Sequence, residues 1–303
     1  MKVIHVGVIG AGSFGRHHVR HLSQHPSVAK VTVVDRSPER AHAAADPVGA
    51  DVARHAGDLA LDAAVIAAPT EFHKEIASDL LERGVPVFVE KPIAATDEEA
   101  RFLVDLARRK GLVLQVGHIE RFSPAFETLA ASVSGVRHIA ARRHNLPRPT
   151  PPVVDVVLDL MIHDIDLVMR LAGAPVAAVA ATACDESGRE SVSAHLTFRN
   201  GVAAEVSASR LSPATDRTLT VHAANGVWRA DLVAKRLDRC HAGSVTEVAL
   251  GDPRDNLQTE LDEFVRAVLG EVSPRVDGAA GAAALAVCNT IRANLATPLL
   301  LTA

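Results

Sequence analysis

The sequence predicts an α/β protein with a doubly wound parallel sheet in its N-terminal part and a C-terminal α+β domain built on an open, mostly antiparallel sheet. Over the first 118 residues, short apolar runs alternate with helical stretches, the pattern of parallel strands joined by crossover helices. Beyond Val176, β-type runs are joined by Asn-Gly pairs that suit tight hairpins. The 303 residues also exceed what one core usually supports, so we expect two domains, at residues 1–120 and 121–303.

Hydrophobic periodicity and helix-ending signals place the N-terminal elements. Thr96 and Glu99 have the spacing of a capping box, and Gly84 and Gly111 each follow a helical stretch, where glycine commonly ends a helix. Strands are expected at residues 3–9, 28–35, 63–68, 85–89 and 112–116, and helices at 17–24, 72–83 and 96–110.

The C-terminal part of the sequence has a different pattern of predicted elements, in which β-type runs follow one another. Between Val176 and Leu237 the β-type runs turn at Asn200-Gly201 and Asn225-Gly226. The other expected elements are a helix at 125–132, a strand at 138–144, a proline-rich link at 147–152, an apolar helix at 156–171 ended by Gly173, and an alanine-rich helix at 281–295.

Composition excludes several classes of protein. Lys+Arg 32 against Asp+Glu 36 leaves a net charge of -4, so no positive excess indicates a nucleic-acid or anionic-membrane partner. Cys184, Cys240 and Cys288 are odd in number and form no CxxC pair, which argues against disulfides and a thiolate zinc site and favours a reducing cytoplasm. The apolar start at residues 3–9 is too short for a signal segment or a membrane span. No tyrosine is present, which excludes a phenol as the catalytic acid.

A glycine-rich segment follows the first expected strand. Gly10, Gly12 and Gly15, with Ser13 and Phe14 between them, open the first expected helix, where glycines allow a tight turn and the close approach of a pyrophosphate. Asp35 ends the next strand twenty residues after Gly15, where a carboxylate can accept hydrogen bonds from a ribose diol. The segment therefore predicts a dinucleotide site. Asp35 should repel a 2′-phosphate and favour NAD, although Arg36 could stack on adenine or pair with that phosphate, which leaves NADP possible.

The segment Val89-Glu90-Lys91-Pro92 ends the fourth expected strand, at the sheet edge where ligands bind in open α/β folds. Pro92 would fix the backbone after Lys91, and Glu90 could hold the lysine ammonium by a hydrogen bond. A ligand-facing Lys91 is one reading, and a solvated lysine at a strand end is the other.

A polar stripe crosses the apolar helix expected at 156–171. Asp159, His163, Asp166 and Arg170 recur at positions i, i+4, i+7 and i+11 of this helix. The stripe would be either a solvated helix face or the wall of a polar cleft, and the surrounding apolar residues favour the cleft. At this spacing Asp159 can set the tautomer of His163, whose other ring nitrogen then exchanges a proton near neutral pH.

These motifs together resemble the Gfo/Idh/MocA oxidoreductases. The resemblance rests on the glycine segment with His18 three residues beyond Gly15, Pro69-Thr70 with His73, Glu90-Lys91-Pro92, and Asp159-x-x-x-His163. It implies an N-terminal Rossmann domain, a C-terminal open sheet often used to form a homodimer or homotetramer, and NAD(P)-dependent oxidation or reduction of a sugar-like hydroxyl. Residues 117–124 and 157–164 resemble the branch that contains UDP-N-acetylglucosamine 3-dehydrogenases of lipopolysaccharide synthesis.

The resemblance also assigns roles to residues. It makes Lys91 the catalytic lysine, His163 the catalytic acid/base and Asp159 its companion. We then expect a secondary alcohol between the domains, with His163 taking the hydroxyl proton while Lys91 stabilises the oxygen; no metal is required. The expected cofactor-binding residues are Gly10, Gly12, Ser13, Phe14, Gly15, Asp35, Arg36, Ala68, Pro69, Thr70, His73, Glu90 and Lys91.

The expected substrate-binding residues are Lys91, His118, Arg121, Arg143, Asp159 and His163. A nucleotide sugar needs cations for its diphosphate, and Arg121 and Arg143 lie in a basic cluster. That cluster is equally the ordinary charge pattern of an exposed strand, and His118 and His18 are as plausible as structural histidines.

Two functions of other kinds remain open. One is a non-catalytic dinucleotide-sensing regulator, although it would have no chemical need of Lys91, Asp159 and His163 together. The other is a reductase of an imine or tetrapyrrole, which an aromatic content of only 3% makes less suitable as a stacking platform.

Overall fold

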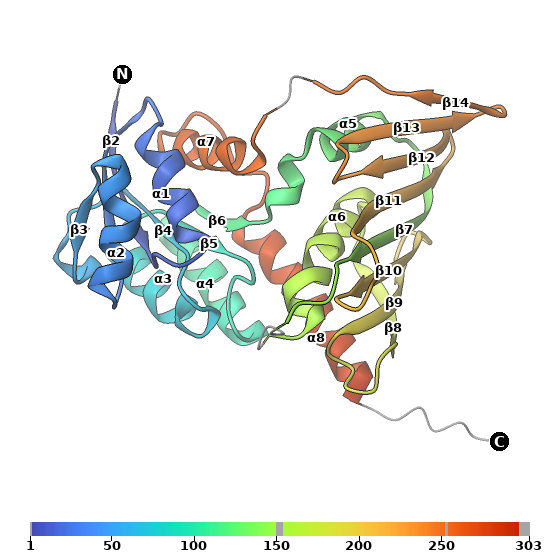
Figure 1. The fold of residues 1–303 in the computed structure, drawn as a ribbon, viewed down its shortest axis with the longest axis horizontal. Coiled ribbons are helices and arrows are strands. Elements are labelled where there is room, and N and C mark those ends of the chain that lie inside the picture. The colour runs from blue at the N-terminus through green and yellow to red at the C-terminus, as the bar shows by residue number, and fades with distance from the viewer. Residues whose placement is uncertain (1, 150–153, 252–253, 297–303) are drawn as a thin grey trace. The chain divides into compact units, whose positions relative to one another are not determined.

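The chain folds into two compact units (Figure 1). The computed structural model describes residues 2–149, 154–251 and 254–296. The first unit comprises Met1–Ile119 and Asp255–Ala283, and the second comprises Glu120–Arg254 and Ala284–Ala303. Residues 255–283 therefore pack with the first unit. From the sequence we expected every residue after 120 to belong to the second domain. The boundary at residue 120 stays a prediction.

The first unit is built on a six-stranded parallel sheet in the order β3-β2-β1-β4-β5-β6. Its strands are β1 (Ile4–Ile9), β2 (Val28–Val34), β3 (Asp51–Ala53), β4 (Ala63–Ile66), β5 (Val87–Glu90) and β6 (Leu114–Gly117). Strand β1 pairs in parallel with both β2 and β4, so the strand order reverses beside β1. The doubly wound parallel sheet is confirmed, and the reversal marks the crevice in which such sheets bind ligands. Only β3 has no expected counterpart, because three residues carry too little periodicity.

Helices connect these strands. They are α1 (Gly15–Ser23), α2 (Pro38–Ala45), α3 (His73–Glu82), α4 (Asp97–Lys110) and α7 (Asn256–Val268). The amide N of Glu99 donates to Thr96 Oγ1 at 3.2 Å, and that of Thr96 donates to Glu99 Oε2 at 3.3 Å, which confirms the capping box. Helix α7 returns to this unit from the end of the chain, and its Leu261 and Phe264 are buried in the core formed with β1 and β2.

The second unit is built on an eight-stranded sheet in the order β14-β13-β12-β11-β7-β10-β9-β8. Its strands are β7 (Val136–His144), β8 (Val176–Ala183), β9 (Ser191–Phe198), β10 (Ala203–Ser209), β11 (Asp216–Ala223), β12 (Gly226–Asp231), β13 (Arg236–His241) and β14 (Ser244–Glu247). Strands β7 and β10 pair in parallel and the other described pairs are antiparallel, which confirms the mostly antiparallel sheet. Asn200-Gly201 turns β9 into β10 and Asn225-Gly226 turns β11 into β12, as expected.

Helices cover one face of this sheet (Figure 1). They are α5 (Pro124–Ser132), α6 (Ile162–Ala172) and α8 (Gly278–Ala296), whose first six residues group with the first unit. A π-helical turn, Val157–Met161, precedes α6 directly. Residues at every second position of β9, such as Leu196 and Phe198, are buried against this layer. Residues 150–153 of the expected proline-rich link lie outside the described residues, and none of the described helices has the length and apolarity to cross a bilayer.

The capping box of α4 provides a test of local stability. Replacing Thr96 by Ala removes the acceptor for the Glu99 amide, which should lower the free energy of unfolding by about 1 kcal/mol. Urea denaturation followed by circular dichroism measures this difference. Ser78→Ala, inside α3, is the matched control and should be nearly neutral, because Ser78 Oγ bonds only to the Glu75 carbonyl of its own helix. An equal effect of both substitutions would show that the cap contributes nothing.

Candidate active site

The glycine-rich loop joins β1 to α1 in the shape that its glycines require. A Cβ on Gly15 would lie 1.8 Å from the carbonyl oxygen of Gly10, and Gly10 itself has φ +100. No side chain fits at either position, so these two glycines build the loop. A Cβ on Gly12 would meet nothing within 4 Å, so this glycine leaves open space at the loop surface. Such space is what close approach of a pyrophosphate needs.

A cavity of about 760 Å³ lies in the first unit beside this loop. Eight of the expected cofactor residues line it: Gly10, Gly12, Ser13, Phe14, Asp35, Arg36, Ala68 and Pro69. Arg40, Arg54 and Phe72 also line the cavity, and we did not expect them from the sequence. The cavity volume falls in the range of small-molecule sites. Its position at the strand-order reversal fits a dinucleotide.

Asp35 is an ionised carboxylate, and both of its oxygens accept hydrogen bonds within the protein. Its Oδ2 accepts from the amide N of Ala11 at 2.7 Å, and its Oδ1 accepts from the amide N of Ser37 at 2.8 Å and from Arg40 Nη2 at 2.9 Å. Burial by itself would raise the pKa of Asp35, but these donors outweigh burial and hold the pKa below its usual value. Asp35 is therefore charged at neutral pH, as binding of a ribose diol requires.

Arg36 stacks on an aromatic ring in the same cavity. Its guanidinium carbon lies 4.4 Å from the centroid of the Phe72 ring. The sequence left Arg36 a choice between adenine and a 2′-phosphate. A guanidinium placed over the Phe72 ring keeps its charge and its own planar shape, so it suits either partner.

The Glu90-Lys91-Pro92 segment stands at the carboxyl end of β5. Lys91 is half-buried. The Glu90 side chain bonds to the backbone of the lysine, because Glu90 Oε2 accepts from the amide N of Lys91 at 3.3 Å. His18 Nε2 lies 2.8 Å from Glu90 Oε1. Burial acts to raise the pKa of Glu90, but the hydrogen bond and charge of His18, with the charge of Lys91, bring the pKa below its usual value.

Three further expected residues follow strands of the parallel sheet: Thr70 and His73 come after β4, and His118 comes directly after β6. His73 is 1% exposed and its two ring nitrogens lie 2.9 Å from Pro92 O and 2.8 Å from Ala68 O. Thr70 begins a single turn of 3₁₀ helix before α3. His118 is 1% exposed just after β6, and its amide N donates to Val116 O. Whether any of them touches a ligand stays a prediction.

In the second unit, Asp159 and His163 come from the π-helical turn and the start of α6. Both are half-buried. Asp159 Oδ2 accepts from Arg210 Nη2 at 2.8 Å, and Arg210 is only 4% exposed. The sequence offered no signal for Arg210, because 51 residues separate it from Asp159. Its charge holds the Asp159 carboxylate in place beside the helix that carries His163.

The four residues of the expected polar stripe differ in how far they are exposed to solvent. Asp159 and His163 are half-buried, Asp166 is 2% exposed and Arg170 is exposed, so exposure changes along the four residues. The π-helical turn contains Asp159, and its wider winding changes the angular position of that residue relative to those on α6. The expected role of this stripe as the wall of a polar cleft stays a prediction.

Arg121 and Arg143, both expected to bind substrate, are engaged in buried ion pairs within the second unit. Arg121 Nη2 donates to Asp166 Oδ1 at 2.8 Å. Arg143 Nη1 donates to Glu120 Oε1 at 2.7 Å and its Nη2 to Asp164 Oδ1 at 2.8 Å. Burial alone would lower the pKa of Arg143, but the two carboxylates raise it further above its usual value. These arginines therefore hold α6 in place from its buried side.

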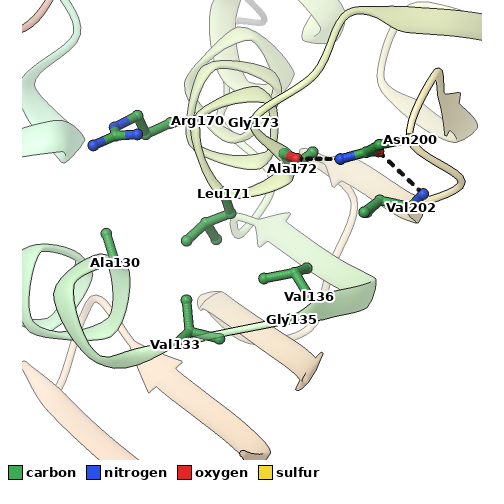
Figure 2. A pocket seen from close by; sticks show the side chains of 10 residues that line it. All are labelled: Ala130, Val133, Gly135, Val136, Arg170, Leu171, Ala172, Gly173, Asn200 and Val202. Carbon is green, nitrogen blue, oxygen red and sulfur yellow. Dashed lines mark hydrogen bonds between the residues drawn. The ribbon is translucent and has the colours of Figure 1, made fainter. Parts of the chain in front are cut away.

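A second cavity, of about 370 Å³, lies at the end of α6 (Figure 2). Asn200 forms part of its wall and donates to the Ala172 carbonyl at 2.8 Å (Figure 2). Arg170 also lines the cavity, and Leu171, Val133 and Val136 face the space (Figure 2). Arg170 of the expected polar stripe lines this cavity, but none of the residues expected to be catalytic or to bind cofactor or substrate does, so we do not assign it to the candidate active site.

Comparisons with known proteins agree with the glycine loop and the sheet order. A family model described as an oxidoreductase family with an NAD-binding Rossmann fold matches residues 4–118, and the C-terminal domain model of the Gfo/Idh/MocA family matches residues 140–229. A UDP-N-acetylglucosamine 3-dehydrogenase from Acidithiobacillus ferrooxidans is 31% identical over 301 residues, covering 94% of this chain and 95% of the relative. The chain belongs to the Gfo/Idh/MocA family of oxidoreductases. It is an enzyme, and its cofactor is NAD.

Other members of the Gfo/Idh/MocA family are also similar. A myo-inositol dehydrogenase, Hyg17, from Streptomyces leeuwenhoekii is 35% identical over 204 residues, covering 60% of this chain and 61% of the relative. The solved structure of the Acidithiobacillus ferrooxidans enzyme GnnA superposes with a TM-score of 0.91 at 30% identity and covers 97% of this chain and 98% of that one. A putative myo-inositol dehydrogenase from Sinorhizobium meliloti gives 0.83 at 26% identity, with coverage of 97% and 98%.

Gly12 and Gly15 differ in the space at their Cβ positions, so substituting them by alanine should have different effects on NAD affinity and on stability. Gly12→Ala adds a methyl group into empty space, so the melting temperature should not change, but the methyl should meet the pyrophosphate and raise the NAD dissociation constant by about tenfold or more. Gly15→Ala serves as the comparison and should lower the melting temperature, because its methyl meets a backbone oxygen. Calorimetric NAD titration and thermal denaturation separate the two. Unchanged NAD affinity in Gly12→Ala would remove this glycine from the cofactor site.

Proposed function

We propose that this oxidoreductase is an NAD-dependent dehydrogenase that acts on a secondary hydroxyl of a nucleotide sugar, with oxidation of UDP-N-acetylglucosamine at C3 as the first candidate. The observation that supports this substrate is coverage: the UDP-N-acetylglucosamine 3-dehydrogenase matches 94% of the chain, whereas Hyg17 matches 60%. Similarity to the nucleotide-sugar enzyme thus extends over nearly the whole chain, including the part of the second unit that carries Asp159 and His163. A place in lipopolysaccharide synthesis, in the cytoplasm, belongs to this proposal.

In the proposed mechanism His163 accepts the hydroxyl proton of the substrate. Lys91 donates a hydrogen bond to the same oxygen and stabilises the negative charge that develops there. Asp159 orients His163, and Arg210 in turn fixes Asp159. NAD supplies the hydride acceptor when it is bound. Asp35 and the glycine loop would hold the adenosine and pyrophosphate parts of the cofactor, as the cavity and the empty space at Gly12 allow.

The phosphate groups of a nucleotide sugar would require cations in the second unit. Arg121 and Arg143 remain part of this proposal, although their donors also serve buried carboxylates. Arg142 and Arg148 are exposed, so they add charge that a diphosphate can reach. We also propose that NADP is accepted as a second cofactor, because Arg40 and Arg36 lie beside Asp35 in the cavity. Assembly through the open sheet into a homodimer or homotetramer completes the proposal.

Oxidation of a cyclic polyol is the second candidate. An inositol 2-dehydrogenase from Corynebacterium glutamicum is 31% identical over 192 residues, which cover 59% of this chain. One from Rhizobium meliloti is 28% identical over 251 residues, which cover 75% of this chain. A polyol has no diphosphate and would not need the exposed arginines. The two candidates therefore differ in whether UDP binds.

The proposed roles of Lys91 and His163 predict a loss of turnover without a loss of cofactor. Lys91→Met and His163→Gln should each lower kcat by about 10²- to 10⁴-fold, because each removes a group that acts on the reacting oxygen. Lys110→Met, on an exposed lysine of α4, is the control and should retain full turnover. NADH formation at 340 nm gives kcat, and calorimetry gives NAD affinity, which should stay close to that of the unchanged protein. Normal turnover in either variant would exclude that residue from the mechanism.

The substrate itself is tested with a panel. NADH should form with UDP-N-acetylglucosamine and not with myo-inositol, and UDP should compete with the sugar nucleotide because the diphosphate provides much of its charge. Initial rates at several UDP concentrations measure the competition. Oxidation of myo-inositol with no effect of UDP would favour the polyol dehydrogenase and overturn the nucleotide-sugar proposal.

A further inference from the structure

Two buried histidines lie next to Lys91 in the first unit. His18 belongs to α1 and is 0% exposed, and His73 is the first residue of α3 and is 1% exposed. His18 contacts the residue before Lys91, and His73 contacts the residue after it. The two helices that carry these histidines follow the two loops lining the cofactor cavity, at Gly10–Phe14 and at Ala68–Phe72.

His18 fixes the Glu90 carboxylate. Its Nε2 lies 2.8 Å from Glu90 Oε1, and Glu90 Oε2 accepts from the amide N of Lys91. His18 Nδ1 is buried and has no hydrogen-bond partner among the described residues, so the contact of Nε2 with Glu90 is what orients the ring. The ring also packs edge-on against Phe88, with centroids 5.4 Å apart. His18 therefore has one orientation and one polar contact.

Gly117 of β6 gives the Glu90 carboxylate its space. A Cβ at this position would lie 2.9 Å from Glu90 Oε2 and 3.1 Å from Phe88 Cζ. The glycine has no positive φ that would require it for backbone reasons. The space that it leaves is taken by the oxygen that bonds to the Lys91 amide, so a larger residue would disturb that contact.

His73 fixes the other side of the lysine. Its ring lies between two carbonyl oxygens, those of Pro92 and Ala68, at 2.9 Å and 2.8 Å. Ala68 also lines the cofactor cavity. Pro92 is itself buried and immediately follows Lys91. Burial lowers the pKa of His73, and a neutral imidazole has one N–H, so the ring donates to one of these carbonyls and packs against the other between Lys91 and the wall of the cavity.

We propose that His18 and His73 are positioning residues, and that together they clamp the backbone on both sides of Lys91 so that its ammonium is held at the substrate oxygen. This inference rests on the proposed catalytic role of Lys91. An apolar side chain could fill either buried position without the cost of desolvating a ring nitrogen, so packing alone gives no reason for histidine at both. Because the clamp starts from helices next to the cofactor loops, it sets the lysine relative to the cofactor site.

Variants of the two histidines test the clamp through turnover. His18→Leu and His73→Leu should each lower kcat by about 10- to 100-fold, since small displacements of a catalytic group have effects of this size. NAD affinity should stay within about twofold, because neither ring lines the cavity. His18→Gln keeps an amide donor where Nε2 of His18 stands, and His73→Asn keeps one where Nδ1 of His73 stands. Both variants should therefore retain most of the turnover that the leucine variants lose. His17→Leu is the matched control on α1, since His17 makes no side-chain hydrogen bond to a described residue, and should leave kcat unchanged.

A second measurement reports the position of Lys91 without activity. The chain has six lysines, so reductive ¹³C-methylation, which keeps the charge, gives few NMR signals, and Lys91→Met identifies the one that belongs to Lys91. That signal should move in His18→Leu and His73→Leu, return toward its original shift in His18→Gln, and stay in place in His17→Leu. Gly117→Ala retains both histidines but displaces Glu90, so it should move the signal as well and covers the case in which a leucine variant fails to fold.

The outcomes separate the clamp from the proposed function. An unmoved Lys91 signal in the leucine variants and in Gly117→Ala would overturn the clamp, whatever the turnover. If the signal moves but Lys91→Met keeps full turnover, the clamp stands as a structural device, and the catalytic role of Lys91 fails instead. Equal losses in His18→Leu and His18→Gln, with no movement of the signal, would show that His18 acts only through folding.

Discussion

The first unit depends on a contact between two backbones that only glycine permits. The carbonyl oxygen of Gly10 occupies the place where a Cβ of residue 15 would stand, 1.8 Å away. This approach brings the start of α1 against the end of β1 and turns the chain sharply enough to leave Gly12 beside open space. The cofactor cavity, the direction of α1 and the location of His18 one turn later all follow from it. A side chain at residue 15 would move the helix, and with it the Glu90 contact at the end of β5.

Local signals in the sequence were sufficient for most of the fold. The capping box at Thr96, the Asn-Gly turns and the glycine segment each act over a few residues, and each has the structure that its chemistry requires. The missed elements do not share one cause: β3 has only three residues, whereas α2 and α7 begin at the capping residues Ser37 and Asp255, which are local signals. The π-helical turn at Val157–Met161 was invisible for a different reason, because an apolar segment has the same composition in either winding.

The site shows the same division between local and distant information. The glycine loop, Asp35 and the Glu90-Lys91-Pro92 segment could be found from spacing within one βα unit. Their partners could not, because 72 residues separate His18 from Glu90 and 51 separate Asp159 from Arg210. Charge pattern alone does not give the environment of Arg143: it is 2% exposed and bonded to Glu120 and Asp164, and its expected contact with a substrate stays a prediction. Burial, which decides between these roles, is a property of the folded sheet.

Carboxylates near the proposed site are each held by a cationic or imidazole side chain. Arg40 bonds to Asp35 and His18 to Glu90 in the first unit, and Arg210 bonds to Asp159 in the second. Buried or half-buried ion pairs of this kind are weak contributors to stability, because desolvation offsets much of their attraction. Their effect on geometry is stronger, since a carboxylate that is already ionised and oriented needs no reorganisation when a ligand arrives. If the proposed mechanism holds, these three contacts serve to orient the carboxylates for a ligand more than to stabilise the fold.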